Sequence, residues 1–265
     1  MSGASVAPKL AIVIHTEEEF DWNGGFIPSA TEVSHGNELL IAIKNLTAIG
    51  AKSTLAMDYA FVSSEQGERC ISNINACREL SEHVEFAAHL HPWVNPPLSE
   101  SFVDSVPEEF SYPGNLPEAE ELSKLKALTE KITVVAKQKP VTYLAGRYGI
   151  GKNTPRILNA LGYKVDVSIS PFADYTHQHG PNFTQYNTDI FYRDGIVNWP
   201  HTSAIVSPFR IARKHFHDAP STYANSSLLN KIMRKVLRAK LHRLSPEGFS
   251  LADMKNVTKY QYDLG

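Results

Sequence analysis

A histidine and several carboxylates follow directly after a short apolar run near the start of the chain. The run from Leu10 to Ile14 is typical of a buried strand, and it continues as His15-Thr16-Glu17-Glu18-Glu19-Phe20-Asp21-Trp22. Because successive side chains of a strand point to opposite faces, a strand that continues through Glu19 would direct His15, Glu17 and Glu19 to one side. Such a row at a strand end could hold a metal ion or transfer a proton.

A second row of the same kind lies downstream, in the segment Val84-Glu85-Phe86-Ala87-Ala88-His89-Leu90-His91-Pro92-Trp93. It predicts a short buried strand that stops at Pro92, so His89 and His91 face the same way. Two imidazoles spaced in this way can bind one cation, and a carboxylate such as Glu17 from a neighbouring strand would complete the ligand set. In the alternative interpretation, one histidine forms a hydrogen bond in the core and the other meets water.

Another histidine pair competes for the role of metal site. His177 and His179 have the same spacing, within Tyr175-Thr176-His177-Gln178-His179-Gly180-Pro181. The Gly-Pro step and the polar neighbours indicate a surface loop, where histidines usually meet only water. We therefore expect the metal at His89 and His91.

Four segments together resemble a known family. They are His15 to Trp22, Ala88-His89-Leu90-His91-Pro92-Trp93, Ala145-Gly146-Arg147-Tyr148-Gly149-Ile150-Gly151 and Leu244-Ser245-Pro246-Glu247-Gly248-Phe249. In this order they resemble the WalW-like branch of the polysaccharide deacetylase (NodB-homology) superfamily, over nearly the whole chain. The resemblance implies a metal-dependent hydrolase that removes acetyl groups from an N-acetylated sugar or polysaccharide. It implies a distorted (β/α)7-type barrel that forms a single catalytic domain over residues 1–265.

If the chemistry that the resemblance implies is kept, individual residues take the following roles. Glu17, His89 and His91 would hold a divalent metal, in the first place Zn²⁺, with Co²⁺ or Ni²⁺ as alternatives. His15 would take a proton from the attacking water, and Arg147 or a backbone amide near Tyr148 would stabilise the oxyanion. Trp22, Trp93 and Tyr148 would offer flat aromatic faces to a sugar ring. In the alternative interpretation, they only pack at the mouth of the barrel. Asp166 is a further candidate for orienting a neighbouring side chain, or else it only accepts from a backbone amide.

The chain departs from the family pattern at three chemical positions. His15 stands where the family has the aspartate base, and Leu144 stands where it has the arginine that orients this base. The family's further strand with a His-Ser-Pro segment, which supplies the general acid, has no equivalent before Gly265, so we expect the last barrel strand to be missing. Two hypotheses follow: a deacetylase of weak activity, or an inactive relative that binds a glycan or a protein partner.

Composition agrees with an enzyme-like domain. A chain of 265 residues can bury one large core, and its formal charge of −2 gives no reason to expect nucleic acid or an anionic membrane as the main partner. The apolar run before His15 is too short for a signal peptide or a membrane span, so we expect a cytoplasmic protein. Cys70 and Cys77 fall seven residues apart in a predicted helix, about 10 Å by the helical rise, which is beyond disulfide reach.

The pattern of apolar residues predicts alternating strands and helices. Strands are expected over 9–16, 53–59, 84–91, 141–145 and 163–170, and helices over 36–49, 65–80, 117–137 and 154–161. This order predicts a parallel sheet, with a long loop over 92–113 that covers the barrel mouth. Beyond residue 172 we expect short strands over 191–194 and 196–200 and helices over 226–243 and 250–264. The basic face of the first of these helices is either solvated or touches an acidic glycan or lipid.

Overall fold

A mostly parallel sheet forms the centre of the protein. The computed structural model describes residues 10–21, 23–224 and 227–264. The strands are β1 (Ile12–Thr16), β2 (Ser53–Met57), β3 (Val84–Leu90), β4 (Thr142–Ala145), β5 (Val165–Asp166), β6 (Phe191–Arg193) and β7 (Ile196–Asn198). Their order in the sheet is β1-β2-β3-β4-β5-β7-β6, and every pair is parallel except β6 with β7. The predicted parallel α/β fold is thus confirmed; among the described residues the sheet stays open, with β1 and β6 at its edges.

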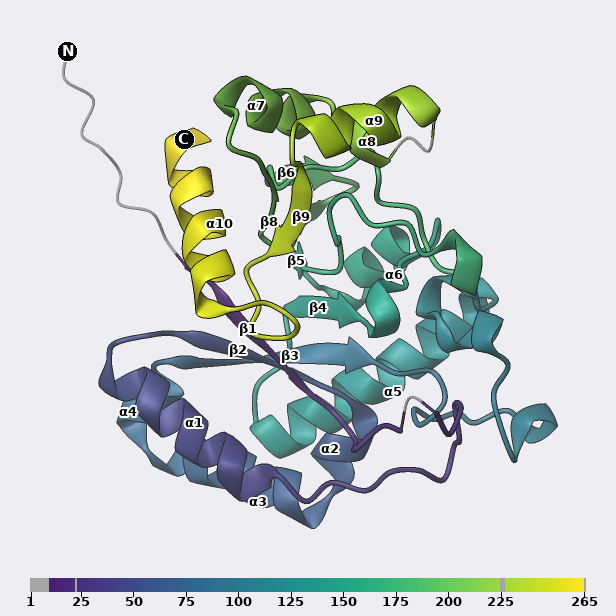
Figure 1. Cartoon of the computed structure of the whole chain (residues 1–265). Coiled ribbons are helices and arrows are strands. Elements are labelled where there is room, and N and C mark those ends of the chain that lie inside the picture. The colour runs from purple at the N-terminus through teal and green to yellow at the C-terminus, as the bar shows by residue number, and fades with distance from the viewer. Residues whose placement is uncertain (1–9, 22, 225–226, 265) are drawn as a thin grey trace.

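Helices cover one face of this sheet. They are α1 (Gly36–Ala48), α2 (Tyr59–Ser63), α3 (Glu65–Ala76), α4 (Arg78–Ser81), α5 (Glu118–Ala136) and α6 (Thr154–Leu161). Figure 1 shows α1, α3 and α5 together on one side of β1 to β3. The main hydrophobic core lies between these layers, and it takes alternate residues of β3, such as Phe86 and Leu90, together with Ile43 and Leu128 from the helices. Because the side chains of a strand alternate, His89 points to the opposite face.

Short 3-10 turns shape the loops near the carboxyl ends of the strands. They are η1 (Glu100–Phe102), η2 (Glu108–Ser111), η3 (Pro113–Asn115), η4 (Gly146–Tyr148) and η5 (Thr176–Gln178). The buried ammonium group of Lys124 on α5 donates to the carbonyls of Pro92, Asn95 and Pro97, at 3.1, 2.9 and 2.6 Å. Three charge-assisted hydrogen bonds from one buried side chain fix the segment that follows His91.

The C-terminal third contains a second sheet and shorter helices than the sequence predicted. A second, antiparallel sheet pairs β8 (Ser203–Val206) with β9 (Lys240–Arg243), and it is accompanied by α7 (Arg210–Asp218), α8 (Pro220–Ala224), α9 (Leu228–Val236) and α10 (Leu251–Leu264). The single helix predicted over 226–243 is wrong in its second half, because the chain turns at Arg238, whose φ of 48° is left-handed, and returns as β9. Figure 1 shows α7, α8 and α9 grouped at the end of the molecule farthest from α1 and α3.

Three smaller expectations also change. Strand β1 ends at Thr16, as the range 9–16 predicts, so the row of side chains does not continue along the strand to Glu19. Strand β5 contains only Val165 and Asp166. The helix expected over 65–80 breaks at Cys77, which is extended and exposed, while Cys70 is buried on α3. Both cysteines are free, as the predicted spacing requires.

Stability should depend on pH through Glu121, which is fully buried on α5. Its Oε1 accepts from the Thr154 hydroxyl at 2.5 Å, its Oε2 has no partner among the described residues, and burial raises its pKa to about 7. The folded state therefore binds a proton that the unfolded state releases, so stability falls as pH rises from about 4.5 to about 7, by up to about 3 kcal/mol. We expect Glu121→Gln to remove this loss.

Urea unfolding at pH 5 and pH 8 tests this expectation. The exposed Glu130 on the same helix provides the control, since Glu130→Gln should keep the pH dependence of the unmodified chain. If the Glu121→Gln variant loses as much stability between these two pH values as the unmodified chain, the proposed role of Glu121 is wrong.

Candidate metal centre

The carboxyl ends of β1 and β3 bring the predicted ligands together. Glu17 follows β1 directly, while His89 lies in β3 and His91 just after it. The Oε2 atom of Glu17 lies 2.9 Å from Nε2 of His89 and 3.5 Å from Nε2 of His91. The Glu17 carboxylate therefore lies beside both imidazoles, which are buried. Among the described residues, the sets whose ligand atoms all lie within 4.8 Å of one another are His15, Glu17 and His89, and Glu18, Asp58 and His91.

The other ring nitrogen of each histidine already has a partner. Nδ1 of His89 lies 3.0 Å from the carbonyl oxygen of Leu144, and Nδ1 of His91 lies 2.8 Å from Oε2 of Glu18. A carbonyl only accepts, so Nδ1 of His89 carries the proton. This arrangement fixes the ring and leaves Nε2 free as a ligand, which is how metal-binding histidines are usually oriented.

Glu18 also contacts the cluster, although it was not among the ligands that the sequence predicted. Its two oxygens accept from His91 and, at 2.8 Å, from the indole N–H of the buried Trp93. Burial raises the pKa of Asp58, and a hydrogen bond to Glu18 raises it further, so Asp58 keeps its proton and donates it to Glu18. Asp58 also caps α2 by accepting from the Phe61 amide at 2.7 Å. Glu18, Asp58 and His91 also have ligand atoms within 4.8 Å of one another, and the N–H groups of His91 and Trp93 hold Glu18 there.

Protonation favours a cation at the first cluster. Burial is the main cause that lowers the pKa of both His89 and His91, so the neutral rings prevail. Burial alone would raise the pKa of Glu17, but hydrogen bonds with His15 and His89 outweigh it and hold the pKa well below its usual value. Two imidazoles whose neutral form is favoured therefore lie beside an ionised carboxylate oxygen, a donor set that a divalent cation can bind.

Distances between the ligand atoms fit a small divalent ion. Ligands about 2.0 to 2.2 Å from a tetrahedral Zn²⁺ are separated by roughly 3.3 Å. The separations of 2.9 and 3.5 Å from Glu17 to the two Nε2 atoms lie on either side of that value. Two imidazoles and one carboxylate also form a donor set that suits Zn²⁺, Co²⁺ or Ni²⁺. The donor types and both distances are therefore compatible with a divalent metal ion.

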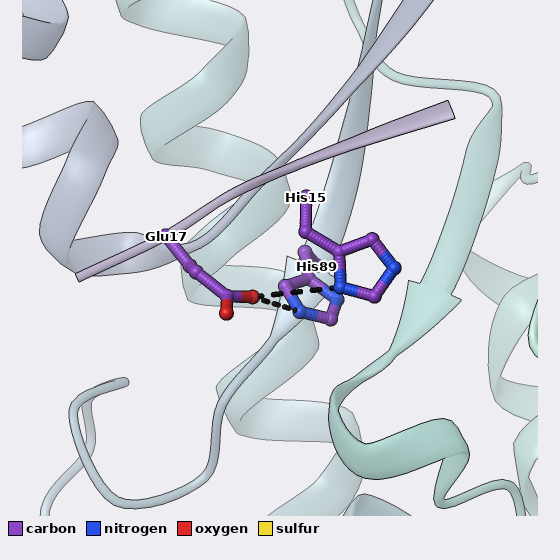
Figure 2. Close-up of side chains that lie close together, drawn as sticks. All are labelled: His15, Glu17 and His89. Carbon is purple, nitrogen blue, oxygen red and sulfur yellow. Dashed lines mark hydrogen bonds and ion pairs between the residues drawn. The ribbon is translucent and has the colours of Figure 1, made fainter. Parts of the chain in front are cut away.

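His15 lies on the open side of this cluster. Its Nδ1 is 3.7 Å from Oε2 of Glu17, its ring centroid is 5.1 Å from that of His89, and 38% of its side chain is exposed. Figure 2 shows both imidazoles turned toward the same carboxylate oxygen of Glu17. His15, Glu17 and His89 have ligand atoms within 4.8 Å of one another. His15 is therefore placed to accept a proton beside the metal or to become a further ligand.

A small residue on β2 allows His15 and His89 to meet. They come from β1 and β3, which are separated by β2, so their backbones are roughly 10 Å apart. At the level of His15, β2 carries Ala56 and β3 carries Ala87. The methyl group of the fully buried Ala56 leaves the space above β2 to the two rings.

Enlarging Ala56 should therefore disturb the centre. We expect Ala56→Leu to weaken metal binding at least about tenfold by displacing the imidazole of His89, and to reduce the free energy of unfolding by about 1–3 kcal/mol through overpacking. Calorimetric titration with Zn²⁺ and urea unfolding measure the two effects. The exposed Ala42 on α1 supplies the control, Ala42→Leu; unchanged metal affinity in Ala56→Leu would contradict the packing argument.

Arg147 lies in a different set of contacts. Its guanidinium donates to Ser111 at 2.6 Å, Glu108 at 3.1 Å and Gln178 at 2.9 Å, and it lies over the rings of Phe26 and Tyr112. These contacts join three loops at the rim of the site. A guanidinium engaged in this way positions the loops and is not free to stabilise an oxyanion.

The predicted sugar-binding aromatics have different surroundings. Trp93 is 2% exposed and stacks on His91, with ring centroids 4.2 Å apart, so its faces are covered. Tyr148 is partly exposed, and its ring lies 6.2 Å from that of His15. Trp22 lies outside the described residues. Tyr148 is therefore the aromatic residue placed to contact a substrate beside His15.

The remaining candidates lie apart from the cluster. His177 and His179 are exposed on the loop around η5, and among the described residues they belong to no group with metal-ligand spacing. Asp166 is buried, accepts from the amide and hydroxyl of Ser168, and has its pKa raised to about 6 by burial. The hydroxyl oxygen of Ser168 in turn accepts from the amide N–H of Ala145 at 2.8 Å. Asp166 therefore orients the end of β4 through Ser168.

Leu144 is the residue at which the sequence resemblance leads one to expect an orienting arginine. It is fully buried and packs with Ala56 and Val167 on the inner face of the sheet. An apolar side chain there offers His15 no charge. Its backbone carbonyl, which orients His89, is the contribution of this residue to the centre.

Comparison with known proteins gives distant structural likenesses. No model of a known family matches the chain, and no curated protein matches it. A provisionally assigned polysaccharide deacetylase from Mycobacterium smegmatis is 22% identical over 51% of this chain and 38% of its own, with a TM-score of 0.35. A CE4 family pseudoenzyme from Bacillus anthracis is 14% identical over 58% of this chain and 42% of its own, with a TM-score of 0.37.

The deacetylase domain of BpsB from Bordetella bronchiseptica is 11% identical over 61% of this chain and 64% of its own, with a TM-score of 0.38. This chain thus spans about two fifths of the first two of these solved chains and about two thirds of the third. Likenesses this distant do not establish a family. Among the described residues, no helix is long and apolar enough to cross a membrane.

Proposed function

We propose that this chain is a metal-dependent amide hydrolase that removes acetyl groups from an N-acetylated sugar or polysaccharide. The observation that carries the proposal is the convergence of Glu17 Oε2 with Nε2 of His89 and His91, while both Nδ1 atoms are held by other acceptors. The resemblance of four sequence segments to the WalW-like deacetylases supports the substrate class. Zn²⁺ is the proposed metal, with Co²⁺ or Ni²⁺ as alternatives.

Each group in the centre has a proposed role. Glu17, His89 and His91 hold the ion, which when bound would polarise the acetyl carbonyl and lower the pKa of a water molecule. His15 takes the proton of the attacking water, because it lies beside the ligands and is partly exposed. Tyr148 contacts the sugar. Since Arg147 is bound to the loops, the backbone N–H of Tyr148 is the proposed donor to the oxyanion.

A second candidate is an inactive relative that keeps the metal and binds a glycan or a protein partner. The buried, apolar Leu144 and the engaged guanidinium of Arg147 favour it, because neither offers a charge to the reacting groups. We therefore expect slow turnover in the unmodified chain.

Released acetate separates the two candidates. The chain loaded with Zn²⁺ is incubated with N-acetylated oligosaccharides, and acetate is measured beside a chelator-treated sample and a His89→Ala variant. Metal-dependent acetate release that is lost in His89→Ala supports the hydrolase. Full metal loading with no acetate from any N-acetylated substrate, together with saccharide binding, would assign the chain to the inactive relatives.

A further inference from the structure

Positive charge is concentrated in one part of the chain. Residues 207–243 contain nine lysines and arginines and one acidic residue, a net charge of +8, although the whole chain carries −2. The rest of the chain therefore has 17 basic and 27 acidic residues, a net charge of −10. The segment 207–243 comprises α7, α8, α9 and β9, and Figure 1 places its three helices together at one end of the molecule. The small overall charge conceals a strongly basic end.

The helix α9 exposes two different faces. With about 100° between successive residues, Met233 and Leu237 point inward, where they pack beside Phe216 and Ile205. Four aliphatic residues lie on one outer side of the helix and are 51 to 75% exposed: Leu228, Leu229, Ile232 and Val236. The basic residues Lys231 and Lys235 are exposed on the other outer side.

Elements near α9 add further exposed aliphatic and basic residues. On α7, Ile211 is 86% exposed and lies between the exposed Arg210 and the partly exposed Arg213. Beyond the C-terminal end of α9 lies a hollow of about 390 Å³, whose charged lining is four basic residues, Arg213, Arg238, Lys240 and Lys259, and the acidic Asp263. The Nε atom of Arg213 is buried and has no hydrogen-bond partner among the described residues. Such a hollow suits a phosphate group.

We propose that α9, with α7 and this hollow, docks on an anionic phospholipid surface. An interfacial helix combines exposed aliphatic residues, which enter the boundary of the acyl chains, with basic residues that attract the head groups. Nucleic acid or an acidic glycan would use the charges but not the four exposed aliphatic side chains. A second copy of this chain would bring together two surfaces with the same positive charge.

Vesicle sedimentation with the full chain tests the proposal. We expect binding to vesicles of equal parts phosphatidylglycerol and phosphatidylcholine, a decrease at high salt, and little binding to phosphatidylcholine alone. The double variant Ile232→Ser, Lys235→Glu should reduce the partition coefficient by roughly tenfold or more. The matched control is Ile41→Ser, Lys44→Glu on α1, where Ile41 is 59% exposed and Lys44 is exposed at the same spacing; it should bind as the unmodified chain does.

Other results would overturn the proposal. They are absence of binding, equal binding to the two vesicle types, or equal loss in the control. Binding to heparin without binding to vesicles would assign the basic end to a polyanion, and a dimer that the α9 variant dissociates would assign it to a second copy. If the first variant fails to give the circular dichroism of the unmodified chain, Leu229→Ser with Lys231→Glu removes one aliphatic and one basic residue of the same helix.

Discussion

Replacing His89 with alanine should reduce bound Zn²⁺ from about one ion per chain to none at micromolar metal. His89 is fully buried, its Nδ1 is held by the Leu144 carbonyl, and its Nε2 lies 2.9 Å from the Glu17 carboxylate. Removing one of three protein ligands leaves too few donors for a stable site. The zinc content per chain after dialysis, measured by elemental mass spectrometry, tests this expectation.

Two further variants make this prediction specific. Glu19 lies two residues after Glu17 but accepts from the amide and hydroxyl of Ser34, so Glu19→Ala should keep the ion. Glu18→Gln keeps the size of the side chain that orients His91 and should weaken binding about 10- to 100-fold without abolishing it. Retention of a full equivalent of metal by His89→Ala, or its loss from Glu19→Ala, would show that the ion is bound elsewhere.

Replacing His15 with alanine should reduce acetate release by about 10²- to 10⁴-fold while the metal stays bound. This is the usual contribution of a positioned general base. His15 lies 3.7 Å from the Glu17 carboxylate and is partly exposed, so it can reach both the ligands and a substrate. Rates at saturating metal, measured beside the metal content of the same sample, separate catalysis from binding.

The outcome also distinguishes the two roles open to His15. If His15→Ala loses the metal, the residue is a fourth ligand and not a base. If both rate and metal content are unchanged, His15 takes no part in the reaction. The family pattern has aspartate at this position, so His15→Asp should turn over faster than the unmodified chain; a slower His15→Asp variant would contradict the comparison with that pattern.

The histidine pair and its strand were predictable because the alternation of β3 is regular. Phe86, Ala88 and Leu90 enter the core on one face, which leaves His89 on the other. The same rule misplaced Glu19, because β1 ends at Thr16 and alternation stops where the strand stops. Once the chain leaves the sheet, consecutive Glu17 and Glu18 can both reach the histidines. No periodic pattern in the sequence predicts that two consecutive glutamates contact the same pair of histidines.

The C-terminal third was less predictable for a related reason. Its apolar and basic residues continue a helical pattern through residue 243, but the chain turns at Arg238. A left-handed turn is usually marked by glycine or asparagine, and neither stands there. The pairing of β9 with β8, more than thirty residues away in sequence, decides the structure instead. Local patterns carry no information on such a distant partner.

The most direct test of the metal centre is a crystal structure of the chain grown with Zn²⁺ and measured at the zinc absorption edge. We expect one anomalous peak about 2.0–2.2 Å from Glu17 Oε2 and from Nε2 of His89 and His91. A peak at His177 and His179, or a structure in which Glu17 and the two imidazoles surround no metal at saturating Zn²⁺, would contradict the proposed centre.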